Sequence, residues 1–143
     1  MRKLISVISI GLILLQSVLP ILLPWSLARA SYAQEAGEEW QPVAESQSYQ
    51  YRNTAVILSF TKVTQPGWLK IKAVAVGDAT GYDITSDMPA GTFTYNLTLP
   101  NPQPDQEAKV QYSEDGQTYQ DLPSEKQNDL LIIKNLDHFT IFV

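Results

Sequence analysis

The stretch that decides the fold class is Thr92-Phe93-Thr94-Tyr95-Asn96-Leu97-Thr98-Leu99. Large apolar side chains and polar side chains alternate strictly along it. Because successive side chains of a β-strand point to opposite faces, this alternation predicts a half-buried antiparallel strand. Phe93, Tyr95, Leu97 and Leu99 would form the buried row, with the threonines and Asn96 facing water.

Further strands are expected on both sides of this stretch. No apolar pattern with the helical period extends beyond a turn or two, and turn residues rich in Gly, Pro, Asp and Asn recur at short intervals. The expected strands are 55–61, 68–76, 108–113, 117–121, 130–133 and 138–143, with a hairpin at Glu114-Asp115-Gly116. The sequence therefore predicts an all-β, antiparallel, immunoglobulin-like β-sandwich of about seven or eight short strands.

The expected core consists of inward rows from several strands. Phe93, Tyr95 and Leu97 are predicted to pack on isoleucines of other strands, namely Ile57, Ile71, Ile132 and Ile141. The segments 77–91 and 100–107 are predicted to be loops that face a partner, since Gly, Pro and Asp are frequent in them.

The N-terminal residues resemble a targeting segment. Arg2 and Lys3 precede an apolar run of about 24 residues, and Ser31-Tyr32-Ala33 offers small residues at the −3 and −1 positions of a cleavage site. We expect an apolar signal helix over residues 1–33 that is cleaved after Ala33. The alternative is an uncleaved signal-anchor, because the run is long enough to cross a bilayer; Pro20 and Pro24 argue against it.

Composition narrows the class of protein. The chain has 143 residues, a net charge of −5 and no cysteine, which excludes disulfides and thiolate metal sites. Loss of residues 1–33 would leave 7 of the 10 basic residues beside all 15 acidic ones, a net charge of −8. Such acidity argues against nucleic acid as a partner. Export without cysteine favours a secreted or cell-surface protein of a bacterial or archaeal envelope.

The mature chain divides into two parts. Residues 34–47 are polar and rich in Glu, with Trp40 and Val43 as the large apolar residues. We interpret this segment as a flexible acidic leader, or a loosely attached first strand, ahead of a β-sandwich domain over 48–143.

Two local patterns resemble known modules. The closing stretch Asn135-Leu136-Asp137-His138-Phe139-Thr140-Ile141-Phe142-Val143 resembles the final strand of immunoglobulin-like modules in prokaryotic surface proteins, which often end in a His-Phe-Ser/Thr sequence. This resemblance implies an envelope protein in which the module is a spacer, a stalk or an adhesion unit. Val110-Gln111-Tyr112-Ser113-Glu114-Asp115-Gly116-Gln117-Thr118-Tyr119 is similar to a hairpin of discoidin-type sandwiches, which implies binding of carbohydrate or lipid headgroups. No binding residue transfers from the second resemblance.

Three aspartates within ten residues are candidate calcium ligands. Asp78, Asp83 and Asp87 lie near Gly77 and Gly81, and Ca²⁺ takes six or more oxygen ligands. Their spacing does not match an EF-hand loop, and solvated turn residues are the plainer interpretation. We expect no other cofactor.

Aromatic residues supply the candidate ligand-binding surface. Trp68 shares its predicted row with Lys70 and Lys72, so it is expected to be exposed, and exposed rings can stack on sugar rings. Trp68, Tyr82 and Tyr119 are the candidate ligand contacts. The alternative is that the tyrosines serve packing alone.

Catalysis finds no support in the motifs. His138 is the one candidate base near neutral pH, and alternation along a strand would point it away from its neighbour Asp137. No nucleophile-elbow motif accompanies it, so we expect a structural role and no enzyme activity. The Asn96-Leu97-Thr98 sequon would matter only in a eukaryotic host.

The expected function is thus a secreted or cell-surface, non-catalytic module acting as a structural spacer or adhesion unit. The alternative is a carbohydrate-binding module that uses exposed aromatics around Trp68. Partners would be other envelope or extracellular proteins, or polysaccharide, with membrane contact only through an uncleaved signal segment. A third hypothesis is an assembly subunit that adds a strand to its neighbour along a long open edge.

Overall fold

The computed structural model describes residues 34–143, which form twelve β-strands and no helix. The predicted signal helix, its cleavage at Ala33 and the alternative anchor lie outside the described residues. No helix within 34–143 is long and apolar enough to cross a bilayer. The strands are β1 (Gln34–Ala36), β2 (Gln41–Pro42), β3 (Ser48–Tyr51), β4 (Ile57–Val63), β5 (Trp68–Val76), β6 (Ala79–Ser86), β7 (Phe93–Pro100), β8 (Val110–Ser113), β9 (Gln120–Leu122), β10 (Glu125–Gln127), β11 (Leu130–Leu136) and β12 (Ile141–Phe142).

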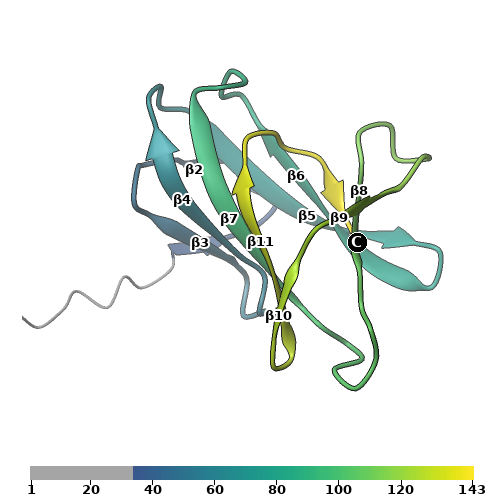
Figure 1. Cartoon of the computed structure of the whole chain (residues 1–143). Coiled ribbons are helices and arrows are strands. Elements are labelled where there is room, and N and C mark those ends of the chain that lie inside the picture. Colours follow the sequence, from purple (N-terminus) through teal and green to yellow (C-terminus); the bar gives the residue numbers. More distant parts are fainter. Residues whose placement is uncertain (1–33) are drawn as a thin grey trace, which may run out of the picture.

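The strands form two layers (Figure 1). One sheet has the order β1-β3-β4-β7-β11-β10 and the other β2-β5-β6-β12-β8-β9. Neighbours are antiparallel except β1 and β3, which run parallel. The prediction of an all-β protein is confirmed. The long strands match the expected ones, whereas most of the additional strands have only two or three residues each.

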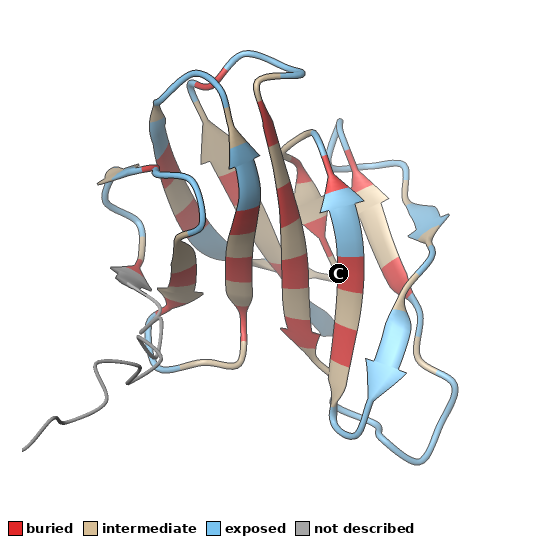
Figure 2. Cartoon of the chain, turned by 60° about the vertical axis from the view of Figure 1, so that its left-hand side comes forward, coloured by how far each residue is buried: buried red, intermediate tan, exposed pale blue. Residues whose placement is uncertain are grey.

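The core lies between the two sheets. In β7 buried and half-buried residues alternate without a break, as its sequence predicts, and Figure 2 shows the same banding along the other long strands. Tyr95 packs against three aromatic neighbours, with its ring stacked on Phe139 at 5.1 Å between centroids. The buried apolar residues from both sheets are Tyr49, Tyr51, Leu58, Phe60, Phe93, Tyr95, Leu97, Leu99, Leu131, Ile133 and Leu136 in one and Leu69, Ile71, Ile84, Val110 and Phe142 in the other.

The predicted isoleucine partners of this core are largely wrong. Ile71 is buried, but Ile57, Ile132 and Ile141 are only half-buried. Their sequence neighbours Leu58, Leu131, Ile133 and Phe142 are the buried residues instead. The runs around these isoleucines are apolar throughout, so alternation could not show which of the two rows faces inward.

The segment 77–91, predicted to be a loop, contains a strand. β5 and β6 form a hairpin in which Val76 pairs with Ala79, so the turn consists of Gly77 and Asp78 alone. Gly77 has a φ of +58°, which a two-residue hairpin turn requires. Gly81 lies inside β6, where a Cβ would come within 3.1 Å of the Phe142 carbonyl oxygen on β12. The close approach of these two strands explains the glycine. A glycine in the middle of a strand had suggested a longer turn.

The acidic segment 34–47 takes part in both sheets. β1 pairs with β3 and β2 pairs with β5. Ala36 and Val43 are buried in the core, and the Tyr49 hydroxyl donates to the Pro42 carbonyl at 2.6 Å. Of the two interpretations of this segment, a flexible leader or a loosely attached first strand, the pairing of β1 and β2 and the burial of Ala36 and Val43 favour the attached strand.

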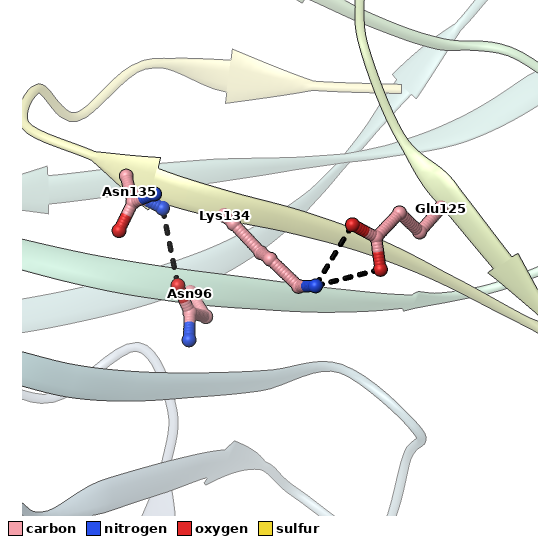
Figure 3. A network of polar contacts seen from close by, with 4 residues as sticks. All are labelled: Asn96, Glu125, Lys134 and Asn135. Carbon is pink, nitrogen blue, oxygen red and sulfur yellow. Dashed lines mark hydrogen bonds and ion pairs between the residues drawn. The ribbon is translucent and has the colours of Figure 1, made fainter.

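A polar network covers the outer face beside β11 (Figure 3). β11 has an irregularity between Ile133 and Leu136, where Asn135 has a φ of +59°. The Asn135 N–H donates to Asn96 Oδ1 on β7 at 3.1 Å. Lys134 pairs with Glu125 of β10 at 2.7 Å. Asn96 therefore supplies the hydrogen-bond acceptor that the bulge takes away from the ladder.

Candidate functional site

Two tryptophans stand out on the outer surface. Trp40 and Trp68 are 46% and 48% exposed, and within residues 34–143 they are the exposed large hydrophobic side chains. The pairing of Pro42 with Trp68 brings the end of the acidic segment alongside β5. Both rings line one hollow of about 400 Å³, together with Asp87. We call these three residues the tryptophan site.

The backbone of the tryptophan site is held firmly. The Trp68 N–H donates to Asp87 Oδ1 at 2.6 Å, and the Trp68 carbonyl accepts a hydrogen bond from the Ser86 hydroxyl at 2.7 Å. Gly67 precedes them, and a Cβ there would lie 2.6 Å from Asp87 Oδ1. The close approach explains why a glycine is needed immediately before Trp68.

A lysine flanks the tryptophan site. Lys70 Nζ lies 5.0 Å from the centroid of the Trp40 ring, a cation–π distance. Lys70 is two residues from Trp68 on β5 and therefore shares its face of the sheet. The site thus combines two ring systems with one ammonium group and one carboxylate, all at the surface. Such a set can stack on flat apolar faces and exchange hydrogen bonds with hydroxyls.

Sequence reasoning named Trp68 but missed Trp40. Trp40 lies in segment 34–47, which was interpreted as a flexible acidic leader or a loosely attached first strand. The pair Trp40 and Val43 among polar residues fits the second interpretation, but nothing in the local sequence indicates that this segment lies beside β5.

The two predicted tyrosine contacts do not join Trp68. Tyr82 is half-buried against the core, with its ring edge-on to Tyr51 at 5.9 Å. Burial raises the pKa of the Tyr82 phenol. Tyr119 lies beyond the β8–β9 hairpin turn, where its hydroxyl is 3.5 Å from the Gly116 carbonyl oxygen. The three aromatics therefore form no common platform.

The three aspartates proposed as calcium ligands are far apart. Asp78 is in the turn before β6 and Asp87 follows its end, a separation of about 30 Å along an extended strand. Asp83, in mid-strand, contacts the Thr85 hydroxyl at 3.4 Å, and Asp87 holds Trp68. In the described part of the chain no group of three or more His, Asp or Glu residues could hold a metal ion. The predicted clustering is thus wrong, because β6 replaces the loop on which it depended.

His138 and Asp137 do contact each other, contrary to expectation. Asp137 Oδ1 lies 3.0 Å from His138 Nδ1, and this hydrogen bond lowers the pKa of the Asp137 carboxyl. Residues 137–140 are not in a strand, so strict alternation does not apply to them. His138 Nε2 is buried without a hydrogen-bond partner. Within residues 34–143 no hydroxyl is hydrogen-bonded to this nitrogen, where a Ser-His-Asp arrangement would have its serine.

The β8–β9 hairpin is organised by one carboxylate. Asp115 Oδ1 accepts hydrogen bonds from the N–H groups of Thr118 and Gln117, at 2.7 and 2.8 Å, and from the Ser113 hydroxyl. These bonds hold the pKa of Asp115 far below its usual range. The neighbouring Gly116 has a φ of +72°. The Thr118 hydroxyl donates to the other carboxylate oxygen, Oδ2, at 3.1 Å. All four hydrogen bonds are internal to the hairpin, so they define its shape and leave little of the carboxylate for a ligand.

The tryptophan site is therefore the surface feature with the chemistry of a recognition site. The hairpin carboxylate is occupied by local contacts, and Asp137 occupies the Nδ1 side of His138. Comparison of the chain with protein-family models, with curated proteins and with solved structures finds no match in any of the three.

Proposed function

We propose that this chain is a secreted or cell-surface, non-catalytic module of immunoglobulin-like type that works as an adhesion unit. The apolar N-terminal run and the absence of cysteine support the location. The immunoglobulin-like interpretation is supported by β3, β4 and β7, which are neighbours although β5 and β6 lie in the other sheet. Strands A, B and E of immunoglobulin sheets are neighbours in the same way, with strand C in the other sheet. The pattern differs beyond β7: the immunoglobulin sheet continues into strand D, which precedes strand E in the sequence, whereas β7 is flanked by β11, which comes later in the sequence.

The exposure of Trp40 and Trp68 is the observation that carries the proposal. Large indole rings are normally buried, and an exposed pair beside one hollow is typical of an interaction surface. A passive spacer needs no such surface. The hydrogen bonds around Trp68 keep its backbone fixed before any partner arrives, which lowers the entropic cost of binding.

Carbohydrate binding is the second candidate, and the same pair favours it. Indole faces stack on the apolar faces of pyranose rings, while Lys70 and Asp87 can exchange hydrogen bonds with sugar hydroxyls. Strand addition has less support, because the outermost strands of both sheets (β1, β10, β2 and β9) have only two or three residues. Short edge strands are a common protection against edge-to-edge pairing.

Two assays with shared variants test these proposals. In the first, the full chain is purified in the form that the producing cell accumulates and is titrated with soluble polysaccharides while tryptophan emission is followed. A saturable shift that is lost in both W40A and W68A supports carbohydrate binding. Tyr119→Ala is the matched control, because it removes an aromatic ring elsewhere on the surface. A flat response to every polysaccharide contradicts the second candidate.

The second assay measures sedimentation of the labelled chain with intact cells of the source. The adhesion proposal expects co-sedimentation that W40A and W68A each reduce and Tyr119→Ala leaves unchanged. Circular dichroism of each variant shows whether the fold survives. If the unaltered chain neither sediments with cells nor responds to polysaccharides, the adhesion proposal is wrong and a spacer is the better interpretation.

A further inference from the structure

A second cavity lies between the two sheets, away from the tryptophan site. It has a volume of about 540 Å³, within the range of small-molecule sites. The start of β6, the end of β7, the start of β8 and the loop 101–109 surround it. Trp68 lies opposite the far end of β6, roughly 23 Å away along the strand, so the two sites are separate.

The floor of this cavity comes from the core of both sheets, where Leu99 and Leu131 contribute from one sheet and Val110 from the other. Each of these three is at most 5% exposed. The rim is exposed and more polar, since it includes Thr80 and Gln103. Since stacked sheets lie about 10 Å apart, the space between them has the width of packed side chains. A slender, flexible chain suits that space better than a broad rigid ring system.

One buried polar group in the wall has no partner. Asn101 is 4% exposed; its N–H donates to the Asp129 carbonyl at 2.7 Å, and its Oδ1 accepts a hydrogen bond from the Gln103 N–H at 3.1 Å. Its Nδ2 is buried and makes no hydrogen bond. Leaving a buried donor unsatisfied costs about 1–3 kcal/mol, so an acceptor at this position would be favourable.

We propose that the cavity binds a medium-length acyl chain whose carbonyl oxygen accepts a hydrogen bond from Asn101 Nδ2. The apolar floor of the cavity fits the hydrocarbon chain of such a ligand, and the unpartnered amide fits its carbonyl oxygen. The charges at the rim of the cavity favour neither an anionic nor a neutral headgroup, because Lys109 is paired with Asp121 at 2.8 Å and the carboxylate of Asp78 also lines the cavity. The shared chemistry is thus the acyl group, whether it comes from a free fatty acid or from a neutral ester.

Access to the amide requires a small movement. Asn101 Nδ2 is closed off from water, and the residues that follow it, 102–107, are all exposed. Lys126 Nζ of β10 holds this loop by donating to the Pro104 and Gln106 carbonyls, so the movement must break these exposed hydrogen bonds. Because exposed loops shift at lower energetic cost than core strands, a displacement of this loop would open the amide to the cavity.

The test is a titration of the ¹⁵N-labelled full chain, followed by amide chemical shifts. The probes are decanoate, monodecanoin and decyltrimethylammonium, all below their micellar concentrations. We expect saturable shifts at residues lining the cavity with the first two probes, which have a carbonyl oxygen. The third has the same chain but no acceptor and should bind at least tenfold more weakly. Decanoate and monodecanoin together distinguish a free acid from an ester.

Asn101→Asp is the sharpest variant, because it keeps the oxygen that holds Gln103 N–H and replaces the donor with an acceptor. It should weaken binding of monodecanoin at least tenfold, whereas Asn53→Asp, on an exposed turn, should have no effect. If Asn101→Asp does not fold, Ala79→Phe at the cavity rim should block binding by occupying the space. Absence of binding, shifts confined to Trp40 and Trp68, or unchanged affinity in both cavity variants would overturn the proposal. Each of these outcomes leaves the adhesion proposal untouched.

Discussion

Replacing Tyr95 with phenylalanine removes one oxygen from the centre of the molecule. The Tyr95 ring is fully buried on β7, and its hydroxyl donates to the His138 carbonyl at 2.9 Å. His138 belongs to the connection by which the chain leaves one sheet for the other, between β11 and β12. The hydrogen bond therefore ties the sheet that contains Tyr95 to the crossing into the second sheet.

The magnitude follows from what the substitution leaves behind. Phenylalanine keeps the stacked contact with Phe139 and creates almost no cavity, so the apolar contribution hardly changes. The net value of a hydrogen bond is about 0.5–1.5 kcal/mol, and an acceptor left without a partner in the interior adds to the loss. We expect the free energy of unfolding to fall by about 1–2 kcal/mol, a substantial part of the stability of a small domain.

Urea unfolding of the full chain, followed by circular dichroism, measures this change. The midpoint should fall while the slope with urea stays the same. Tyr112→Phe is the matched control, since the Tyr112 hydroxyl bonds the exposed Gln120 side chain at 3.2 Å and its loss should cost less than about 0.5 kcal/mol. If Tyr95→Phe costs no more than Tyr112→Phe, the argument that this hydrogen bond secures the crossing is refuted.

Three further outcomes follow from the same contacts. Burial, with a smaller effect of the Asp137 charge, raises the pKa of Tyr95 in the folded protein well above 10. The contribution of the neutral phenol to stability is therefore complete below pH 10 and is lost as the pH rises further. Urea midpoints at pH 9, 10 and 11 should decline less steeply in Tyr95→Phe than in the unaltered protein. Asn96→Ala removes the acceptor at the β11 bulge and should cost about 0.5–1.5 kcal/mol by urea unfolding, with no loss of strand content in circular dichroism. Gly67→Ala places a Cβ against Met88 Cγ and should cost about 1–3 kcal/mol in urea unfolding and shift tryptophan emission, whereas an unchanged spectrum would contradict the tight packing before Trp68.

The sequence predicted best those strands whose two faces differ in polarity. β7 is the clearest case, because Phe93, Tyr95 and Leu97 alternate with polar residues and all three are buried. β4 and β11 were located, but their inward rows were not, since Ile57 and Ile132 are as apolar as the buried residues beside them. Where both faces of a strand are apolar, the packing of the other sheet decides which face is buried, and the local sequence carries no information about that packing.

The candidate site was only partly predictable for a related physical reason. Exposure of Trp68 could be inferred from its own strand, because its row continues into Lys70 and Lys72. The partnership with Trp40 depends on a two-residue pairing between Pro42 and Trp68 across 26 positions of the chain. The burial of Asn101 could not be predicted either, because it depends on residues distant in the sequence: its N–H bonds the Asp129 carbonyl, and Leu131 lines the same cavity.

The two proposed sites lie at opposite ends of the β5–β6 hairpin, and their separation follows from the length of its two strands. A two-residue turn at Gly77 joins two long strands, so the hairpin extends from the tryptophan site at one end to the start of β6 at the other. At the first end β2 pairs with Trp68 and Leu69, and the indole rings of Trp40 and Trp68 stay exposed beside this pairing. At the second end Ala79, Thr80 and Tyr82 of β6 line the cavity. Because the two sites lie at opposite ends of the hairpin, they can be altered independently, and a variant that changes binding at the tryptophan site should leave the cavity intact.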